Sequence, residues 1–208
     1  MTTEQRYRAI LNNHLPAEAV DWVYNYLNRY KVHFHITRER TSKLGDYRWP
    51  QGDHNFHEIS VNGDLNPYMF LWVLLHEAAH LETHLKYKRV AAHGHEWQAE
   101  YAALLRENIH FFPAEVHASI ALYASRIPLT RAVGRRIEEM LHRYDKGFDA
   151  TVLHLDDLPA GSLFRLKRKP ELLVRSQEKR RTRWLCKEVA TRRQYTVNGS
   201  AEVEKVDE

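Results

Sequence analysis

The most apolar segment of the chain is Phe70–Leu85, which reads FLWVLLHEAAHLETHL. Hydrophobic residues fall on almost every side of this segment when it is projected as a helix, a pattern typical of a helix buried in a core. The polar residues His76, Glu77 and His80 interrupt the pattern. Burying such side chains is costly unless they have partners, so this helix is the first candidate for chemistry.

Helical periodicity also predicts helices on either side of this segment. Residues 3–30 favour two helices that are separated at His14–Pro16. Lys86–Ala92 has the character of a connecting turn, and a further helical pattern covers residues 93–109. Two more helical patterns occupy residues 113–144.

Alternation with a period of two predicts a small sheet before the apolar helix. Residues 32–36 alternate as in a half-buried strand, with Lys43–Trp49 as the expected hairpin partner, and His57–Asn62 predicts a further strand. The exposed edge of such a sheet can bind an extended polypeptide as an added strand. Either Lys43–Trp49 or Phe56–Val61 can be that edge, and the pattern does not decide between them.

From Gly147 onwards the pattern changes to short strand-like runs separated by Pro, Gly and Asn-Gly turn signals. The runs are residues 152–158, 162–166, 172–175, 183–189 and 194–197. We therefore expect one domain over residues 1–146 and a small β-rich appendage over residues 147–208. The predicted fold class is α+β, with a small sheet beside the apolar helix.

The run His76-Glu77-Ala78-Ala79-His80 has the spacing of a metal site on a helix. Residues four apart lie on the same side of a helix, so His76 and His80 can bind one ion. Two neutral imidazoles at this spacing suit Zn²⁺, and Glu77 is then placed to hold a water molecule and take its proton. This arrangement predicts hydrolysis of a peptide bond. The alternative is a pair of hydrogen-bonded core histidines, with Glu77 turned to solvent.

A catalytic zinc site needs a third protein ligand and one open position. His84 continues the helical spacing, but it lies ~12 Å along a straight helix from His76, whereas Zn–N bonds are ~2 Å. His93 and His95 are the other candidates. Gly94 permits a sharp turn next to His93, whereas His95 falls near the start of the following helix. The chemistry favours His93 and leaves His95 open.

Several of these motifs resemble one known family. LLHEAAHLETHL followed by HGHEW is similar to the SprT-like zinc metallopeptidases, which include the eukaryotic Spartan proteases and share the pattern H-E-x-x-H, then H-G-x-E-[WF]. The stretches Ser42–Arg48 and Ile59–Asn62 are also similar to bacterial members of that family. The resemblance covers about residues 5–110.

The resemblance implies a zincin-like fold and one catalytic Zn²⁺. The family's metal ligands fall on His76, His80 and His93, its catalytic glutamate falls on Glu77, and His95 falls on a variable position. Many members continue into a cysteine-bearing zinc ribbon, whereas this chain has one cysteine. A second zinc is therefore not expected, and the appendage stands roughly where the ribbon would be.

Composition limits the class of protein. With 43% hydrophobic residues, a chain of 208 residues can form a sizeable core. The N-terminus lacks the apolar region of a signal peptide, and no stretch approaches the ~20 apolar residues that cross a bilayer. A single cysteine excludes an intrachain disulfide. We therefore expect a cytoplasmic protein without membrane contact.

The net charge of +4 is unevenly distributed. Residues 165–193 hold twelve Lys and Arg against three Glu, a local balance of +9, so the remainder of the chain sums to −5. Cations interleaved with aromatic residues suit phosphate contacts and base stacking, so DNA is the expected partner. The candidate contacts are Arg165, Lys167, Arg168, Lys169, Lys179, Arg180, Arg181, Arg183 and Trp184. A charged surface that only keeps the protein soluble is the alternative.

Three functions are compatible with these observations. The leading hypothesis is a zinc-dependent metalloendopeptidase with protein or peptide substrates. Because Spartan-type relatives act on proteins bound to DNA, DNA-associated proteins are a candidate substrate class. The alternative is a nucleic-acid-associated regulatory or binding protein with structural zinc and little catalysis. A hydrolase of a non-peptide amide ranks last. Tyr68, Tyr87 and Tyr101 are candidate oxyanion donors, and no spacing argument separates them.

Overall fold

The computed structural model describes the chain except for residues 41, 53–54, 149–151, 181–182, 200 and 207–208. The chain divides into two compact units, Met1–Phe148 and Asp149–Glu208. The described residues form six α-helices and two sheets. The fold is therefore α+β, as the sequence predicts.

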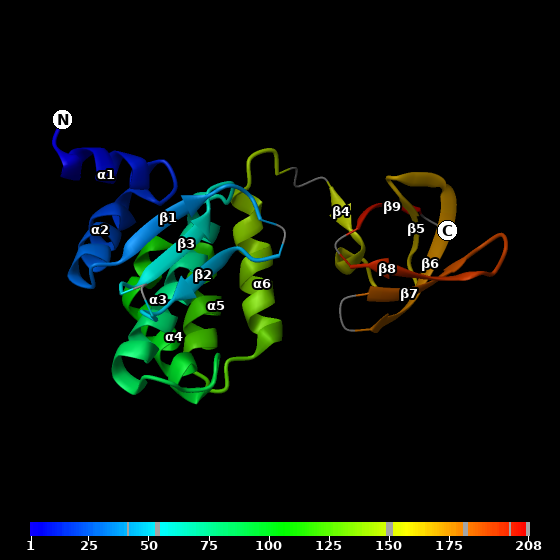
Figure 1. Cartoon of the computed structure of the whole chain (residues 1–208). Coiled ribbons are helices and arrows are strands. Elements are labelled where there is room, and N and C mark those ends of the chain that lie inside the picture. Colours follow the sequence, from blue (N-terminus) through cyan, green and yellow to red (C-terminus); the bar gives the residue numbers. More distant parts are fainter. Residues whose placement is uncertain (41, 53–54, 149–151, 181–182, 200, 207–208) are drawn as a thin grey trace. The chain divides into compact units, whose positions relative to one another are not determined.

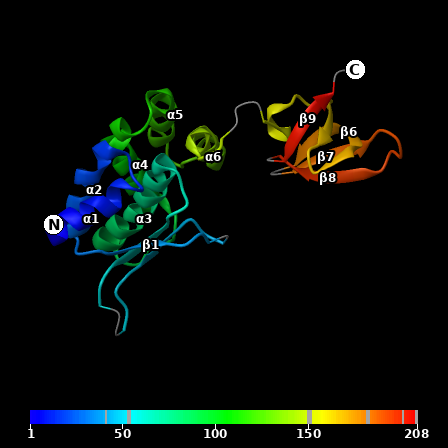
Figure 2. The same cartoon turned by 90° about the horizontal axis from the view of Figure 1, so that it is seen from above.

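The first unit is built in two layers. Strands β1 (His33–Thr37), β2 (Gly45–Arg48) and β3 (Glu58–Asn62) form a sheet, and the helices of the unit lie on one side of it (Figures 1 and 2). The strand order is β1-β3-β2, with β1 parallel and β2 antiparallel to β3. The sheet thus presents both β1 and β2 as edge strands.

The expected hairpin between the first two strands is wrong. β2 pairs with β3 and not with β1. The reason is burial, since Ile59 and Val61 are fully buried and β3, the most buried of the three strands, takes the centre of the sheet. This arrangement also answers the question of the sheet edge, because it places Lys43–Trp49 at the edge and Phe56–Val61 inside.

Helix α3 (Pro67–Tyr87) is the centre of the first unit. Asn66 caps its N-terminus by accepting hydrogen bonds from the backbone N–H groups of Tyr68 and Met69, both at 3.0 Å, and Pro67 takes the first helical position. Twelve of its 21 residues are buried, as expected for a helix that is apolar all round. It packs against β2 and β3 on one side and against α4 on another.

The remaining helices follow the periodicity of the sequence. Their bounds are α1 (Thr3–Asn12), α2 (Val20–Arg29), α4 (His95–Asn108), α5 (Ala114–Ala124) and α6 (Arg131–Leu141). The predicted break between the first two helices and the predicted turn after α3 are both confirmed. None of the helices that the structure describes is long and apolar enough to cross a membrane.

The second unit is a curved antiparallel sheet around a small core (Figure 1). Its strands are β4 (Leu153–His154), β5 (Leu163–Leu166), β6 (Lys169–Arg180), β7 (Arg183–Glu188), β8 (Gln194–Asn198) and β9 (Glu202–Val206), in the order β4-β9-β5-β6-β7-β8. Phe164, Val174, Trp184 and Cys186 belong to its core.

Three details of the second unit differ from the expected strands. The run 152–158 contains only the short strand β4, followed by a 3-10 turn, and residues 172–175 are the middle of the 12-residue strand β6. Strand β9 was not expected, because its sequence EVEKV carries only two apolar residues. Pairing with β5 on one side and β4 on the other makes it a strand.

Candidate metal centre

Three histidine side chains converge in the first unit. His76 and His80 lie one turn apart on α3, and His93 lies two residues before α4. Nε2 of His93 is 3.1 Å from Nε2 of His76 and 3.1 Å from Nε2 of His80. Potential ligand atoms of all three residues lie within 4.8 Å of one another. This cluster could hold a metal ion.

The donor set of the cluster fits a small divalent ion. A tetrahedral ion with bonds of about 2.0–2.1 Å to nitrogen places its ligand atoms about 3.3 Å apart, close to the observed spacing. Burial, together with the neighbouring imidazoles, lowers the pKa of His76 to about 3 and that of His80 to about 4. Burial also lowers the pKa of His93. The rings are therefore neutral at neutral pH, as metal ligands must be.

The turn before α4 brings His93 to the cluster. His93 has a positive φ of 58°, a left-handed conformation that costs a non-glycine residue about 1–2 kcal/mol. The sequence placed the sharp turn on Gly94, but Gly94 has extended backbone. Gly94 is needed for a different reason, since a Cβ there would lie 2.9 Å from the carbonyl oxygen of Ala91. The backbone strain thus falls on the residue that brings the third imidazole.

The two competing ligands lie outside the cluster. His95 is the exposed first residue of α4. His84 packs against Trp49 and His57, with ring centroids 6.0 Å and 5.7 Å apart. Within the part of the chain that the structure describes, the cluster is the only group of three potential metal ligands. The geometry therefore selects His93 from the three candidates.

Trp97 forms one wall of the cluster. Its ring centroid lies 4.6 Å from that of His76, 5.3 Å from that of His80 and 4.6 Å from that of His93. The side chain is buried, and its indole N–H has no hydrogen-bond partner in the described structure. From the sequence, Trp97 is known only as a member of the HGHEW motif. Its contact with all three rings restricts their orientations.

Glu77 lies beside the cluster with its carboxylate against the edge strand β2. The residue is only 7% exposed. A Cβ on Gly45 would lie 2.5 Å from Oε1 of Glu77 and 2.7 Å from Cγ1 of Val73. β2 can therefore approach α3 this closely only because residue 45 is glycine. The alternative in which Glu77 turns to solvent is excluded by this contact and by the burial.

The environment of Glu77 favours its protonated form. Burial, and to a smaller extent the charge of Asp46, raises the pKa of Glu77 to about 8. Lys43 and Arg40 act in the opposite direction. A carboxyl group with a pKa near the working pH can both accept and donate a proton, which is the property that general acid–base catalysis requires.

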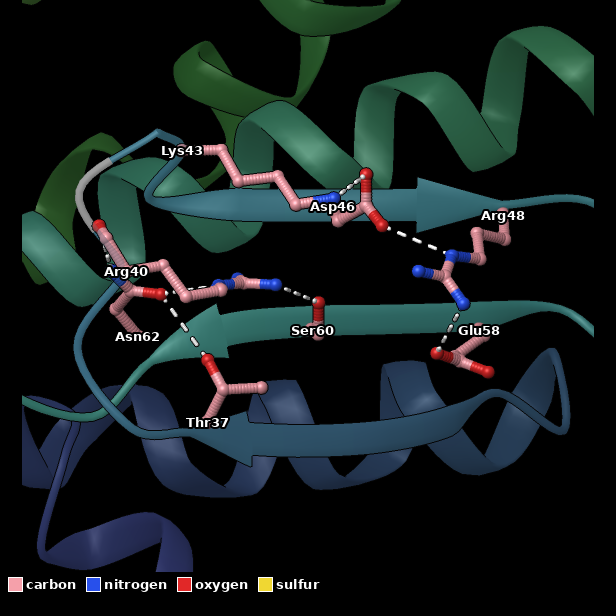
Figure 3. A network of polar contacts seen from close by, with 8 residues as sticks. All are labelled: Thr37, Arg40, Lys43, Asp46, Arg48, Glu58, Ser60 and Asn62. Atoms are coloured by element: carbon pink, nitrogen blue, oxygen red, sulfur yellow. Dashed lines mark hydrogen bonds and ion pairs between the residues drawn. The ribbon is translucent and has the colours of Figure 1, made fainter.

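A polar network on the outer face of the sheet fixes the segment that leads into β2 (Figure 3). Nε of Arg40 donates to Oδ1 of Asn62 at 2.7 Å, and its Nη1 donates to Oγ of Ser60 at 3.1 Å. Nδ2 of Asn62 donates in turn to the backbone carbonyl of Arg40 at 3.1 Å. The β1–β2 connection is thereby held to the central strand β3.

Asp46 extends this network along β2 (Figure 3). Its carboxylate pairs with Nζ of Lys43 at 2.9 Å and with Nε of Arg48 at 3.1 Å. The side chain of Asp46 lies on the outer face of the sheet, whereas Gly45 lies on the face that packs against α3. These two ion pairs lie within the β2 segment, on the face opposite Glu77, and Arg48 reaches β3 through Glu58, with Nη1 3.9 Å from Oε1.

None of the three candidate oxyanion donors from the sequence has a described hydrogen bond from its hydroxyl group to the histidine cluster. Tyr68 packs on Tyr144, with ring centroids 4.7 Å apart, and Tyr87 is exposed. Tyr101 packs against the ring of His76 at 5.5 Å, but it is fully buried and its hydroxyl donates to the carbonyl of Trp72.

Tyr47 is not among the candidate oxyanion donors from the sequence, but it lies near the histidine cluster. It lies two residues after Gly45, so it occupies the same face of β2. Its ring is nearly parallel to that of His80, with centroids 6.3 Å apart. Its hydroxyl lies 2.9 Å from Nδ1 of His57. The alternation of a strand is the signal that could have identified it, once Gly45 was known to face α3.

The candidate nucleic-acid contacts fall into two groups in the second unit. Arg165, Lys167, Arg168 and Lys169 lie at the β5–β6 hairpin, and Lys179, Arg180 and Arg183 lie at the β6–β7 hairpin. β6 has 12 residues, so its two ends are about 36 Å apart along the strand. Arg181 lies outside the described residues.

Some of these candidates already have partners within the unit. Trp184 is buried in the core, and its Nε1 donates to Oδ1 of Asp156 at 2.7 Å. Its ring is therefore not available for base stacking, which corrects the expectation for this residue. Lys179 pairs with Asp156 at 2.8 Å, and Lys167 pairs with Glu202 at 3.5 Å.

Comparisons of the chain with known protein-family models, with curated proteins and with solved structures gave no match. Function must therefore be inferred from the geometry of the histidine cluster and Glu77.

Proposed function

We propose that this protein is a zinc-dependent metallopeptidase of the SprT-like kind. The observation that carries the proposal is the pairing of three neutral imidazoles at ligand spacing with a buried carboxyl group beside them. His76, His80 and His93 would hold the ion, and a three-histidine set leaves one position open, as in catalytic rather than structural zinc sites. When bound, zinc supplies a Lewis acid that polarises a carbonyl group and lowers the pKa of water.

Glu77 is the general base and then the general acid in this proposal. Its carboxylate accepts a proton from the attacking water as the new C–O bond forms, and it delivers that proton to the leaving amine as the C–N bond breaks. Burial raises its pKa in the metal-free protein, and the charge of a bound ion would act in the opposite direction. Gly45 permits the edge strand to approach this carboxyl group, and the hydrogen bonds between Arg40 and Asn62 hold the segment before β2 to the central strand.

The position of β2 supports an extended peptide as substrate. β2 is an edge strand that packs against α3, and Tyr47 on it contacts the ring of His80. A peptide that adds to this edge would be bound mainly through main-chain hydrogen bonds, which accept varied side chains. A small non-peptide amide would leave most of this edge unused.

The decisive experiment combines zinc content with cleavage by the wild type and by Glu77→Gln. We expect one zinc per chain in both proteins, with cleavage of an unfolded protein substrate lost only in the variant. Full activity of Glu77→Gln in a clean preparation would contradict the proposal. Bound zinc with no cleavage by the wild type, together with unfolding of His76→Ala, would favour a binding protein with structural zinc instead.

The exposed cations of the second unit support a further proposal, that this unit contacts nucleic acid. Arg168, Lys169, Arg180 and Arg183 are exposed near the two ends of β6. Phosphate contacts by such residues release counterions, so the affinity must fall steeply with salt. Affinity for DNA that equals the affinity for a polyanion control and lacks this salt dependence would refute the contact.

A further inference from the structure

A cavity of the first unit lies between α2, α3 and α4, apart from the histidine cluster. It has a volume of about 270 Å³ and is open to solvent. Residues from three helices line it, namely Trp22, Asn25, Tyr26, Arg29, Tyr30, Glu82, Leu104 and Glu107. Glu82 follows His80 by two residues, which is about 200° around a helix. The cavity therefore lies on the side of α3 turned away from the histidine cluster.

Aromatic rings form one wall of this cavity. Trp22 and Tyr26 are stacked with centroids 5.0 Å apart, and Tyr26 and Tyr30 lie 4.9 Å apart. The guanidinium group of Arg29 already lies 5.9 Å from the centroid of the Tyr30 ring. Such rings attract cations through their quadrupoles. Leu104 is buried and supplies an apolar surface.

Two carboxylate side chains, Glu82 and Glu107, complete the lining. The hydroxyl of Tyr26 donates to Oε1 of Glu82 at 3.3 Å, and Nε1 of Trp22 donates to Oε1 of Glu107 at 3.3 Å. These donors are neutral, so they orient the carboxylates without cancelling their charge. Arg29 is the one cation among the lining residues, against two carboxylates. The cavity therefore has a net negative charge next to aromatic and apolar surfaces.

We infer that this cavity binds an alkyl chain that ends in an ammonium group, as in a lysine side chain of a bound polypeptide or in a free diamine. The methylene groups would lie along Leu104 and the aromatic rings, and the ammonium group would reach Glu82 and Glu107. A neutral chain of the same length would gain only the apolar contact. An anion would be repelled by both carboxylates.

The test is an NMR titration of the full-length chain, with the indole N–H signal of Trp22 as the probe of the cavity. The probe ligands are the acetyl-lysine methylamide, the neutral acetyl-norleucine methylamide and 1,5-diaminopentane. We expect saturable shifts of the Trp22 signal with the lysine amide and affinity about tenfold lower for the norleucine amide, the factor that corresponds to a cation–aromatic and carboxylate contribution of about 1.4 kcal/mol. Equal affinity for the two amides, or shifts that do not saturate, would overturn the inference.

Three variants and one control sharpen this test. Glu82→Gln and Glu107→Gln keep an acceptor for the neutral donors and remove the charge, so each should weaken binding of the lysine amide several-fold. Arg29→Gln removes a like charge and should strengthen it. Glu139→Gln, on α6, changes a carboxylate that pairs with Arg135 and should have no effect. Equal weakening by Glu82→Gln, Glu107→Gln and Glu139→Gln would show that only net charge matters and would contradict a built site.

The two sources of the ligand are distinguished by the third probe. Tighter binding of 1,5-diaminopentane than of the lysine amide would assign the cavity to free diamines, whereas the reverse order would assign it to a polypeptide side chain. Because the titration can be repeated on Glu77→Gln, its outcome is independent of whether the protein hydrolyses peptides.

Discussion

Gly45 of β2 and Glu77 of α3 approach each other so closely that the missing Cβ of the glycine is part of the site. A Cβ at residue 45 would lie 2.5 Å from Oε1 and 2.8 Å from Cγ of Glu77. The first contact is shorter than real Cβ atoms tolerate, so any larger residue must displace either the strand or the carboxyl group. The proposed base is therefore held in place partly by a residue that has no side chain.

Gly45→Ala should reduce cleavage by about 100-fold while zinc remains bound, because a displacement of the catalytic group by about 1 Å costs that much. Overpacking at this site should also destabilise the fold by roughly 1–3 kcal/mol. Gly52→Ala is the control. A Cβ at residue 52 meets no atom within 4 Å, but the positive φ of 59° makes alanine there unfavourable by about 1–2 kcal/mol. Parallel kinetics and unfolding curves of the two variants measure both effects. Equal activity of the two variants would show that Gly45 has no role in the site.

His93→Ala should lose zinc, whereas His95→Ala should keep it. The first change removes one of three clustered donor atoms, and the second changes an exposed side chain at the start of α4. Loss of a direct ligand should exceed the roughly 10–100-fold drop in affinity that is typical of changes in the surrounding shell. Elemental analysis and competition with a chelator measure the difference. Zinc that survives His93→Ala at full stoichiometry would transfer the third ligand to another residue.

The metal-free protein should be most stable near pH 6.5. His76 and His80 have depressed folded-state pKa values of about 3 and about 4, so the unfolded chain binds more protons below about 6.5 and stability falls as the pH falls. Glu77 has a raised folded-state pKa of about 8, so the folded chain keeps a proton that the unfolded chain loses, and stability falls as the pH rises towards 8. Between about 4.5 and 6.5 the two histidines outweigh the single carboxyl group.

Chemical denaturation of the metal-free protein at about pH 5, 6.5 and 8 tests this pH dependence. The Glu77→Gln variant has no carboxyl group to titrate at residue 77, so the decline between 6.5 and 8 should be lost and the decline below 6.5 should become steeper. A wild-type stability that rises continuously from pH 6.5 to 8 would show that the environment of Glu77 does not favour its protonated form.

The sequence predicts those parts of this structure that depend on local pattern. The helix around His76 and His80 and the turn that precedes the next helix both follow from periodicity. Pairing between distant strands does not follow from such patterns, which is why β3 was not recognised as the central strand. The close approach of Gly45 to Glu77 is of the same kind, since it depends on where an edge strand meets a helix.

Burial of aromatic side chains is another property that local pattern leaves open. Trp184 stands among cations in the sequence, and that neighbourhood suggested a stacking platform. In a strand, however, residues alternate between two faces, and the face of Trp184 is shared with Cys186 in the core. Its cationic neighbour Arg183 is on the exposed face.

This difference leads to a prediction for nucleic-acid binding by the second unit. Arg168→Ala and Arg183→Ala should each reduce the slope of log affinity against log salt by about 1, because each removes one phosphate contact.

Trp184→Leu should leave DNA affinity unchanged at a temperature where the variant is folded, whereas loss of a stacking residue would cost about 1–3 kcal/mol. It should instead destabilise the unit, because Asp156 loses the indole donor and the core loses volume. Salt titrations on a labelled single strand, beside unfolding curves, separate these effects; a tenfold loss of affinity in folded Trp184→Leu would return Trp184 to the binding surface.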